Sequence, residues 1–390
     1  MAVRIALVTV TLGTVGPARA LLTLAERLDR GRFAPHFMTL SPPTSGDCDQ
    51  LERLGVPYAA INMTGPFDMR GLWQMAALLR RWRIDLVHAR LQRAGFYARL
   101  AALMAGRPPV LVNVVNMYGT HFRFQHGAVL GRPLLGAERA TAGLVDRWVA
   151  NSRAVAADLQ EVAHIPGDKV SVVHNAVDTT AFDGLSCETA DQTRRSLGLG
   201  RDEAVVGSVS RLVPLKRIEL LIDAMALLPP QSRPAVLLVV GDGPCRPALE
   251  AQAQRLGVRV VFAGDRSDVP RLLSIMDVLA FSSSTEGQPN AVLEAMAARV
   301  PVVAARIPGI DEVIVDRVTG LIVEAQPEAF AEALAALVDD PSRRAAFGAA
   351  GRARAEERFS PELMVTSFDT IYTSMLAGAP GHAAPRAAGI

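Results

Sequence analysis

The sequence predicts an α/β protein built from two doubly wound domains with parallel sheets. Three observations support this expectation: the length of 390 residues, short apolar β-branched runs that alternate with helical patterns, and a polar interruption near the middle of the chain. An ordinary domain has about 100 to 200 residues, so this length fits two. Apolar strands alternating with helices are typical of a parallel sheet covered by helices on both faces.

The first series of strands and helices ends before a polar stretch at 176–202. Its expected strands are 3–10, 34–40, 84–89, 109–115, 146–151 and 169–175, and its expected helices are 17–30, 71–83, 93–105 and 152–163. The polar stretch is rich in turn-forming residues, which indicates a domain boundary. We therefore expect a first Rossmann-like domain over 1–180.

A second series follows this boundary. Its expected strands are 204–210, 235–241, 258–264, 277–283, 300–305 and 320–324. It predicts a second Rossmann-like domain over 181–360, then a helix over 361–377 and a tail over 378–390 whose composition favours disorder. Open parallel sheets bind ligands outside the carboxyl ends of their strands, so the loops that follow strands are the candidate site.

The composition excludes several classes of protein. Hydrophobic residues make up 50% and charged residues 21% of the chain, with a formal net charge of +2. This profile is that of a globular protein and gives no sign of nucleic-acid binding. Cys48, Cys187 and Cys245 form no CxxC pair, which argues against a disulfide framework or a zinc site. The histidines lack metal-ligand spacing, and we expect neither a metal nor a cofactor.

The start of the chain imitates a secretion signal, with Arg4, an apolar run and a small-residue end near residue 20. We favour a mature first strand, because the apolar run is short, rich in Val and Thr, and followed by a turn at 13–16. No stretch reaches the about 18 apolar residues of a membrane span. We expect a cytoplasmic protein, with the basic stretch LLRRWRID (78–85) as a basis for peripheral contact with a membrane.

Two cations follow the first strand of the second series. Arg211 and Lys216 lie between a strand that ends at Ser210 and a helix that starts near Arg217. A planar guanidinium and a compact ammonium together suit a diphosphate. The alternative is two solvated surface charges, but the position at the carboxyl end of a strand favours binding.

Glycines follow the next two strands. Gly241 and Gly243 flank Asp242, and Gly264 ends the strand after that. Glycine lets a backbone turn sharply and approach a ligand closely. Plain turns use the same pattern, so these glycines indicate donor binding only together with the other residues.

The stretch SSSTEGQPNAVLEAMA (282–297) places Glu286 in a loop and Glu294 in the helix after it. Either Asn290 is the N-cap of that helix or Pro289 is its first residue. The loop at Gly287, Gln288 and Pro289, together with the amides of the first helical turn near Asn290, makes an anion site. Glu294 can accept from a vicinal diol such as a ribose. Solvated surface acids are the plain alternative. A glycosidase would also use two carboxylates, but it explains neither the cations nor the two sheets.

The order of several motifs resembles the retaining GT-B glycosyltransferases of family 4. The segments are KVSVVHNAVD, RLVPLK, VGDGPCRPALE, FAGDRSDVPRLL, SSTEGQPNAVLEAMA, PVVAARIPGIDEVI and TGLIVE. The resemblance implies that Glu294 holds the donor ribose and that Glu286, in the E-x7-E motif, lies beside the transferred sugar. Arg211 and Lys216 would neutralise the diphosphate without a divalent metal, and the helix 361–377 would pack back on the N-terminal domain.

The resemblance further implies a hexosyltransferase that uses a UDP- or GDP-linked sugar and a glycan or lipid-linked acceptor. Front-face attack would retain the anomeric configuration, with Glu286 orienting the sugar rather than forming a covalent bond. The chain departs from the family pattern on the acceptor side. Asn116 stands where the family often has a histidine, with His121 close by, and Gly16 belongs to an altered glycine motif. Further departures are Arg299, Ala176 and the pair Pro308 and Gly309.

Some alternatives remain open from the sequence. His88 lies near the end of the expected strand 84–89, where it either contacts the sugar or acceptor or has a hydrogen-bonded structural role. A nucleotide-sugar epimerase or phosphorylase would use the same fold. A non-catalytic nucleotide-sugar binder would explain Asn116.

Overall fold

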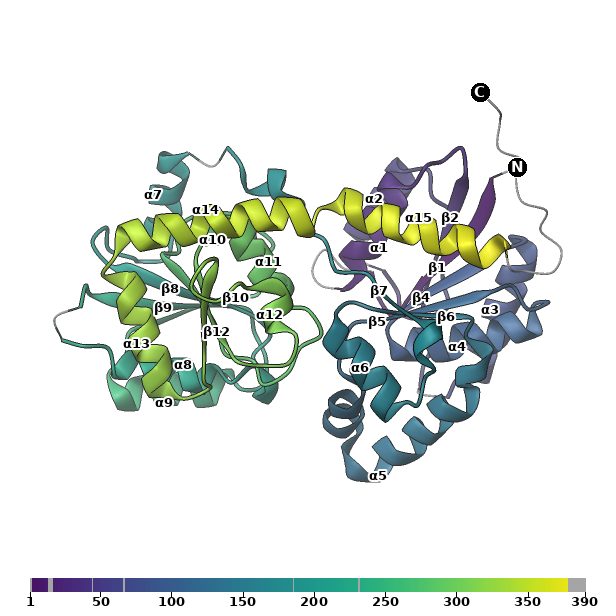
Figure 1. Ribbon diagram of the computed structural model, residues 1–390, viewed down its shortest axis with the longest axis horizontal. Coiled ribbons are helices and arrows are strands. Elements are labelled where there is room, and N and C mark those ends of the chain that lie inside the picture. Colours follow the sequence, from purple (N-terminus) through teal and green to yellow (C-terminus); the bar gives the residue numbers. More distant parts are fainter. Residues whose placement is uncertain are drawn as a thin grey trace. The chain divides into compact units, whose positions relative to one another are not determined.

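The computed structural model describes residues 2–12, 17–43, 45–65, 67–184, 186–230 and 232–377, with the backbone alone for 17–18, 45, 120–131 and 187. The chain divides into two compact units, Met1–Asn175 with Pro361–Ile390 and Ala176–Ser360. Each unit is a parallel sheet with helices on its faces (Figure 1). This architecture confirms the predicted fold class.

The first unit contains a seven-stranded sheet in the order β3-β2-β1-β4-β5-β6-β7. The strands are β1 (Val3–Thr9), β2 (Phe33–Thr39), β3 (Tyr58–Ala60), β4 (Leu86–Arg90), β5 (Val110–Val114), β6 (Arg147–Ala150) and β7 (Val170–Val172). The helices are α1 (Pro17–Arg27), α2 (Ser45–Arg53), α3 (Met69–Arg81), α4 (Gln92–Met104), α5 (Tyr118–Thr141), α6 (Arg153–Val162) and α15 (Pro361–Ala377), with 3-10 turns at Ala142–Leu144 and Gly167–Lys169.

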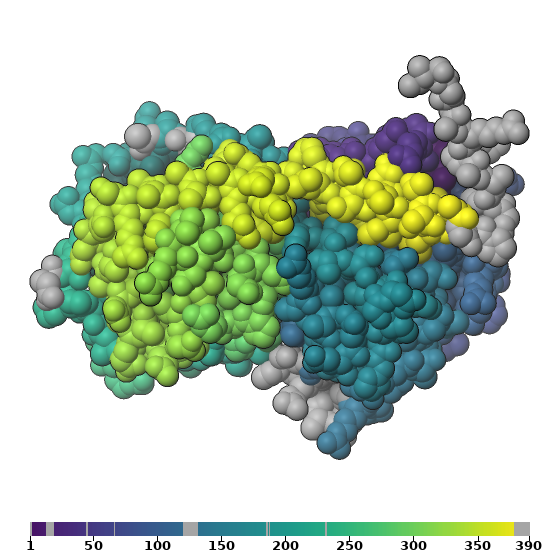
Figure 2. Space-filling model, viewed as in Figure 1, coloured from purple at the N-terminus to yellow at the C-terminus, as the bar shows by residue number. Residues whose placement is uncertain are grey.

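Alternate residues of β1 face opposite sides of this sheet. Ala6 and Val8 belong to the buried cluster that α3 and α4 cover. The helix α15 packs against α1 and lies along the surface of this unit (Figures 1 and 2). Arg27 of α1 pairs with Glu362, and Arg32 Nη1 lies 2.5 Å from Asp369 Oδ2. The last helix is therefore attached to the first unit by ion pairs as well as by packing.

The second unit contains a six-stranded sheet in the order β10-β9-β8-β11-β12-β13. The strands are β8 (Ala204–Val209), β9 (Ala235–Val240), β10 (Val260–Gly264), β11 (Val278–Phe281), β12 (Val302–Ala305) and β13 (Gly320–Val323). The helices are α7 (Cys187–Ser196), α8 (Ile218–Ala226), α9 (Arg246–Leu256), α10 (Val269–Leu273), α11 (Asn290–Ala297), α12 (Ile310–Val313), α13 (Pro327–Val338) and α14 (Pro341–Arg358), with 3-10 turns η3 (Thr179–Phe182) and η4 (Pro214–Lys216).

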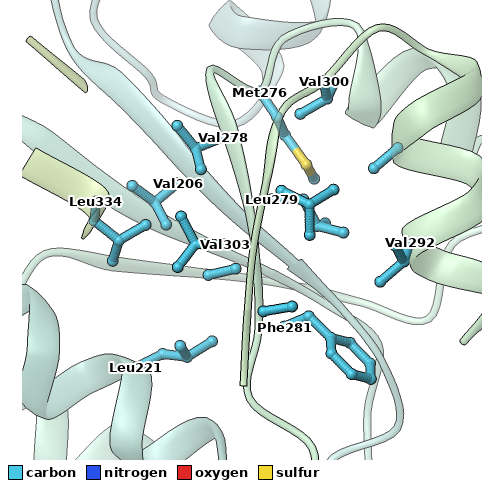
Figure 3. Packing of buried hydrophobic residues seen from close by; sticks show 14 of the residues in the cluster. Val206, Leu221, Met276, Val278, Leu279, Phe281, Val292, Val300, Val303 and Leu334 are labelled. Atoms are coloured by element: carbon cyan, nitrogen blue, oxygen red, sulfur yellow. The ribbon is translucent and has the colours of Figure 1, made fainter. Parts of the chain in front are cut away.

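Successive residues of β11 point into two different layers of the core. Val278 lies on the side of Leu221 and Leu334, from α8 and α13, whereas Leu279 and Phe281 lie on the side of α11 (Figure 3). A strand with apolar side chains on both faces has to be covered on both faces. This burial sets where β11 ends, and thereby where the loop before α11 begins.

The structure adds elements that the sequence patterns did not predict. The strand β3 and the helix α2 lie in a segment without a clear period, and the expected boundary stretch 176–202 contains η3 and α7. The first unit ends at Asn175 rather than at residue 180. The expected tail, 378–390, lies outside the described residues. Among the described helices, none is both long and apolar enough to cross a bilayer.

Candidate active site

The order of the second sheet reverses between β8 and β11, which are neighbours although β9 and β10 come between them in the chain. Ligands of open parallel sheets bind at such a switch point, because the two following loops diverge there. The loop at 210–217 follows β8, and the loop at 282–289 follows β11. These two loops carry Arg211, Lys216 and Glu286.

Arg211 and Lys216 differ in their surroundings. Arg211 is exposed, and its guanidinium has no hydrogen bond or ion pair within the part of the chain that the structure describes. Lys216 is the last residue of η4 and is partly buried. The next residue, Arg217, has a φ of 47°, in the left-handed region that favours glycine.

Arg217 connects the two loops. Its Nε donates to the carbonyl oxygen of Ser282 at 2.9 Å, and its Nη2 donates to that of Ser283 at 3.1 Å. In return, the Ser282 hydroxyl donates to the carbonyl oxygen of Lys216 at 2.7 Å. A left-handed residue other than glycine costs about 1 to 2 kcal/mol. These hydrogen bonds offset that cost and hold the backbone of Lys216 against the loop of Glu286.

Lys216 and Glu286 form an ion pair between the two loops. Only 20% of the lysine side chain and 18% of the glutamate side chain are exposed. The hydroxyl of Ser283 lies 3.4 Å from the same carboxylate oxygen of Glu286. The sequence assigned these two residues to different parts of a ligand, and it did not predict their direct contact.

Gly241 and Gly243 allow the loop after β9 to approach the loop after β8. A Cβ at Gly241 would lie 2.1 Å from the carbonyl oxygen of Ser210, and one at Gly243 would lie 2.4 Å from that of Leu212. The amide of Gly241 also donates to the carbonyl oxygen of Gly264 at 2.8 Å. In the structure, therefore, these glycines approach neighbouring backbone, and they shape the loop that carries Arg211.

Glu294 lies one turn into α11 and is half-buried. Both expected starts of this helix are wrong, because Pro289 is the N-cap residue, with a φ of −78°, and Asn290 is the first helical residue. The proline forms no side-chain cap bond, so it leaves the first amides of the helix to other acceptors. Gly287, Gln288 and Pro289 are buried between β11 and the helix.

His88 lies in the core of the first unit. It is fully buried in β4, its Nδ1 is 2.6 Å from the Tyr372 hydroxyl of α15, and its ring lies 4.8 Å from that of Phe368 between centroids. Burial, with a smaller contribution from the charge of Arg90, lowers the pKa of His88 to about 3. The proposed contact with sugar or acceptor is therefore corrected to the structural role.

The other residues expected on the acceptor side are placed only in part. Asn116 follows β5 and is half-buried. His121 lies in α5, but its side chain falls outside the description, as does Gly16 altogether. Their roles remain predictions. No cluster of three or more His, Cys, Asp or Glu suited to a metal occurs among the described residues.

The chain matches two family models in sequence. The model described as Glycosyltransferase Family 4 matches residues 15–181, and the one described as Glycosyl transferases group 1 matches residues 189–354. The second match contains Arg211, Lys216, Glu286 and Glu294. Together the matches cover most of both units.

Curated relatives and solved structures agree with these matches. The chain is 32% identical to a D-inositol 3-phosphate glycosyltransferase of Segniliparus rotundus over 309 residues, which are 76% of this chain and 68% of the relative. It is 26% identical to an α-1,3-galactosyltransferase of Escherichia coli over 75% of this chain and 76% of the relative. Among solved structures, HepE of Anabaena in complex with UDP-glucose has a TM-score of 0.82 at 23% identity, over 95% of this chain and 99% of HepE. This last likeness concerns the fold alone. The chain therefore belongs to family 4 of the glycosyltransferases (glycosyl transferases group 1), and it is a glycosyltransferase with the GT-B fold.

Proposed function

We propose that the protein transfers a hexosyl group from a nucleoside diphosphate sugar to a hydroxyl of a glycan or lipid-linked acceptor, with retention of anomeric configuration. The observation that carries the proposal is the ion pair of Lys216 and Glu286 at the switch point of the second unit, with Arg211 exposed on the same loop as Lys216. This arrangement provides cations for a diphosphate and a carboxylate for the sugar in one place.

In the proposed reaction, one bond at the anomeric carbon breaks and another forms. The bond to the diphosphate oxygen breaks, the bond to the acceptor oxygen forms on the same face, and the acceptor proton moves to a phosphate oxygen. Negative charge grows on the diphosphate as it leaves, and cations placed there stabilise the transition state. An ammonium has three N–H donors, so Lys216 can keep Glu286 and still donate to a phosphate. Arg211 supplies the second cation, and the proposal needs no divalent metal.

The names of relatives suggest the donor and the acceptor. The Escherichia coli relative is named for transfer from UDP-Gal to a diphosphoundecaprenol-linked sugar. HepE was solved with UDP and with UDP-glucose. A relative from Corynebacterium glutamicum is named for GDP-mannose and a phosphatidylinositol mannoside. We propose UDP as the first donor nucleotide to test and a lipid-linked glycan as the first acceptor.

A thermal-shift screen against UDP, GDP, ADP and their sugar conjugates tests donor binding. A ligand that binds the folded state raises the melting temperature. We expect the largest rise with UDP, and a smaller rise in Lys216→Ala and Glu294→Gln. Losing one charge-assisted hydrogen bond weakens binding by about 1.5 to 3 kcal/mol. An unchanged rise in both variants would remove these residues from the donor site.

The fate of the anomeric carbon tests the reaction class. Proton NMR of the product made from an α-linked donor should show an α-linkage. The rate of sugar transfer should be unchanged when EDTA is added. A β-linked product would refute retention, and loss of the rate in EDTA would refute the metal-free mechanism. Incubation of the donor without acceptor separates the alternatives, because an epimerase would then form a second nucleotide sugar, and a phosphorylase would need inorganic phosphate.

A further inference from the structure

The large apolar side chains with the highest exposure among the described residues lie close together at the start of α3. Phe67 is 70% exposed, Met69 is 63% exposed and Trp73 is 60% exposed. Met69 and Trp73 are four residues apart on one helix, so they are neighbours on its surface. Apolar groups gathered in this way on a surface mark a contact site, whereas single exposed side chains are ordinary.

The start of α3 is fixed in a way that keeps these side chains outside. Asp68 is the N-cap, and its carboxylate accepts from the amide of Gly71 at 2.8 Å and from the amide of Thr64 at 3.0 Å. The amide of Asp68 donates to the hydroxyl of Tyr97 in α4 at 2.6 Å. The opposite face of α3 buries Leu72, Met75, Ala76 and Leu79 in the core. With that face occupied, Trp73 cannot turn inward without unfolding the helix.

The exposed side of α3 is also strongly basic. Arg70, Arg80, Arg81 and Arg83 are exposed, and the segment 69–84 contains no Asp or Glu. Arg80 is bound to the carbonyl oxygen of Met104, while no ion pair of Arg70 or Arg81 occurs within the described residues. We call Phe67, Met69, Arg70, Trp73 and Arg81 the α3 surface. Its apolar end also carries Arg70, and Arg81 lies at the other end of the helix.

We propose that the α3 surface docks on an anionic lipid bilayer. Phe, Met and Trp side chains lower their free energy by entering the boundary between headgroups and acyl chains, and Trp prefers that boundary in particular. The negative potential of an anionic membrane surface attracts each Arg that lies near it. A nucleic acid would match the charge but not the apolar end. The surface would bring the enzyme to an acceptor in the membrane, but vesicle binding itself needs no sugar transfer and is measured without donor.

Co-sedimentation of the full chain with vesicles tests the proposal. The wild type should bind phosphatidylcholine vesicles that contain phosphatidylglycerol, bind pure phosphatidylcholine vesicles weakly, and dissociate as salt is raised. We expect Phe67→Ser/Trp73→Ser and Arg70→Glu/Arg81→Glu each to reduce partition by roughly tenfold or more. In a Trp82→Phe background, adding Trp73→Phe should largely abolish quenching of tryptophan fluorescence by brominated lipid while binding persists, because the remaining tryptophan, Trp148, is buried in the core.

Matched controls lie on the second unit. Leu227→Ser removes an apolar side chain that is 50% exposed, and Arg195→Glu reverses an exposed charge in α7. Neither variant should change the partition of the protein onto vesicles. Equal loss in these controls would overturn the proposal, as would a wild type that stays in the supernatant at low salt. Analytical ultracentrifugation gives the third arm. A dimer that Phe67→Ser/Trp73→Ser dissociates, without any vesicle binding, would assign the α3 surface to a second copy of the chain instead.

Discussion

The Lys216 ammonium contacts the Glu286 carboxylate between the loops that follow β8 and β11. Each side chain is about four-fifths buried, so each charge has lost most of its water. A partly buried charge is stable when an opposite charge replaces the lost water, and it becomes costly when that partner is removed. The pair therefore fixes together the position of the carboxylate and of the cation that we propose to bind the diphosphate.

We expect Glu286→Gln to lower kcat for sugar transfer by roughly tenfold or more. The amide keeps the shape of the side chain but loses the charge, and a charge-assisted hydrogen bond contributes about 1.5 to 3 kcal/mol. Initial rates with donor and acceptor near saturation measure the change. Glu332→Gln, an exposed acid on α13 of the same unit, is the matched control and should keep the wild-type rate. If both variants keep that rate, Glu286 has no part in the reaction.

Arg217 should act as a positioning residue for the ion pair. Arg217→Gly removes the two hydrogen bonds to the carbonyl oxygens of Ser282 and Ser283, but it accommodates the φ of 47° without strain. We expect kcat to fall by roughly tenfold while the melting temperature changes little, because the relief of about 1 to 2 kcal/mol of left-handed strain offsets the lost bonds. Steady-state kinetics and thermal unfolding of the same samples separate the two effects.

Arg299→Gly is the matched control for this change. Arg299 has a φ of 58° in the same unit, and 59% of its side chain is exposed. The variant should be as stable as the wild type or slightly more stable, with unchanged kcat. A loss of activity in Arg299→Gly equal to that in Arg217→Gly would mean that left-handed arginines affect the unit generally and not the site.

Acid should destabilise the first unit through His88. Burial lowers the folded-state pKa of His88 to about 3, and its unfolded value is near 6.5. The unfolded chain therefore binds the proton first, so stability is lost as the pH falls from about 6.5 towards 3. The expected loss between pH 7 and pH 5 is about 2 kcal/mol. Urea unfolding monitored by tryptophan fluorescence measures it, because Trp73, Trp82 and Trp148 all lie in the first unit.

His88→Gln provides the comparison. The amide cannot be protonated in this range, so this part of the pH dependence should disappear although the variant is less stable at pH 7. Tyr372→Phe removes the hydroxyl from the hydrogen bond and leaves His88 buried, so it should keep the dependence. If the wild type and His88→Gln lose the same stability between pH 7 and pH 5, the proton is taken up by a group other than His88.

Glu138→Gln should weaken the first unit by about 3 to 5 kcal/mol, because it leaves a buried cation without its partner. Arg99 Nη2 lies 2.9 Å from Glu138 Oε2, the arginine side chain is 0% exposed, and the hydroxyl of Tyr118 donates to the same oxygen at 3.1 Å. Burial raises the pKa of Glu138 against the opposing effect of Arg99. Urea unfolding followed by tryptophan fluorescence reports the change, because all three tryptophans lie in the first unit and the Arg99 guanidinium lies over the Trp148 ring.

A double variant distinguishes the ion pair from general damage to the core. Arg99→Met/Glu138→Met removes both charges. It should lose less stability than Arg99→Met and Glu138→Met lose in sum. An additive double variant would mean that the two charges do not stabilise each other.

Much of the fold was predictable because buried parallel strands are apolar on both faces and alternate with helices. The expected strands of the second series coincide with β8 to β13 apart from end residues, and the last helix has the expected bounds of 361–377. The strand β3 was missed because it has three residues and is only half-buried, which leaves too little pattern to recognise. The start of α11 was assigned wrongly because proline and asparagine both suit several positions of a first turn.

The sequence by itself determined which residues lie in the loops after β8, β9 and β11, because strand order along the chain dictates which loop follows which strand. Only the tertiary structure decided that Lys216 contacts Glu286 and that Arg217 ties their loops together, since residues about seventy positions apart meet through strand pairing and not through local pattern. It also placed His88 in the core, because a single histidine in an apolar strand carries no local signal for which side of the sheet it faces. The exposure of Phe67, Met69 and Trp73 depends in the same way on which face of α3 the sheet covers.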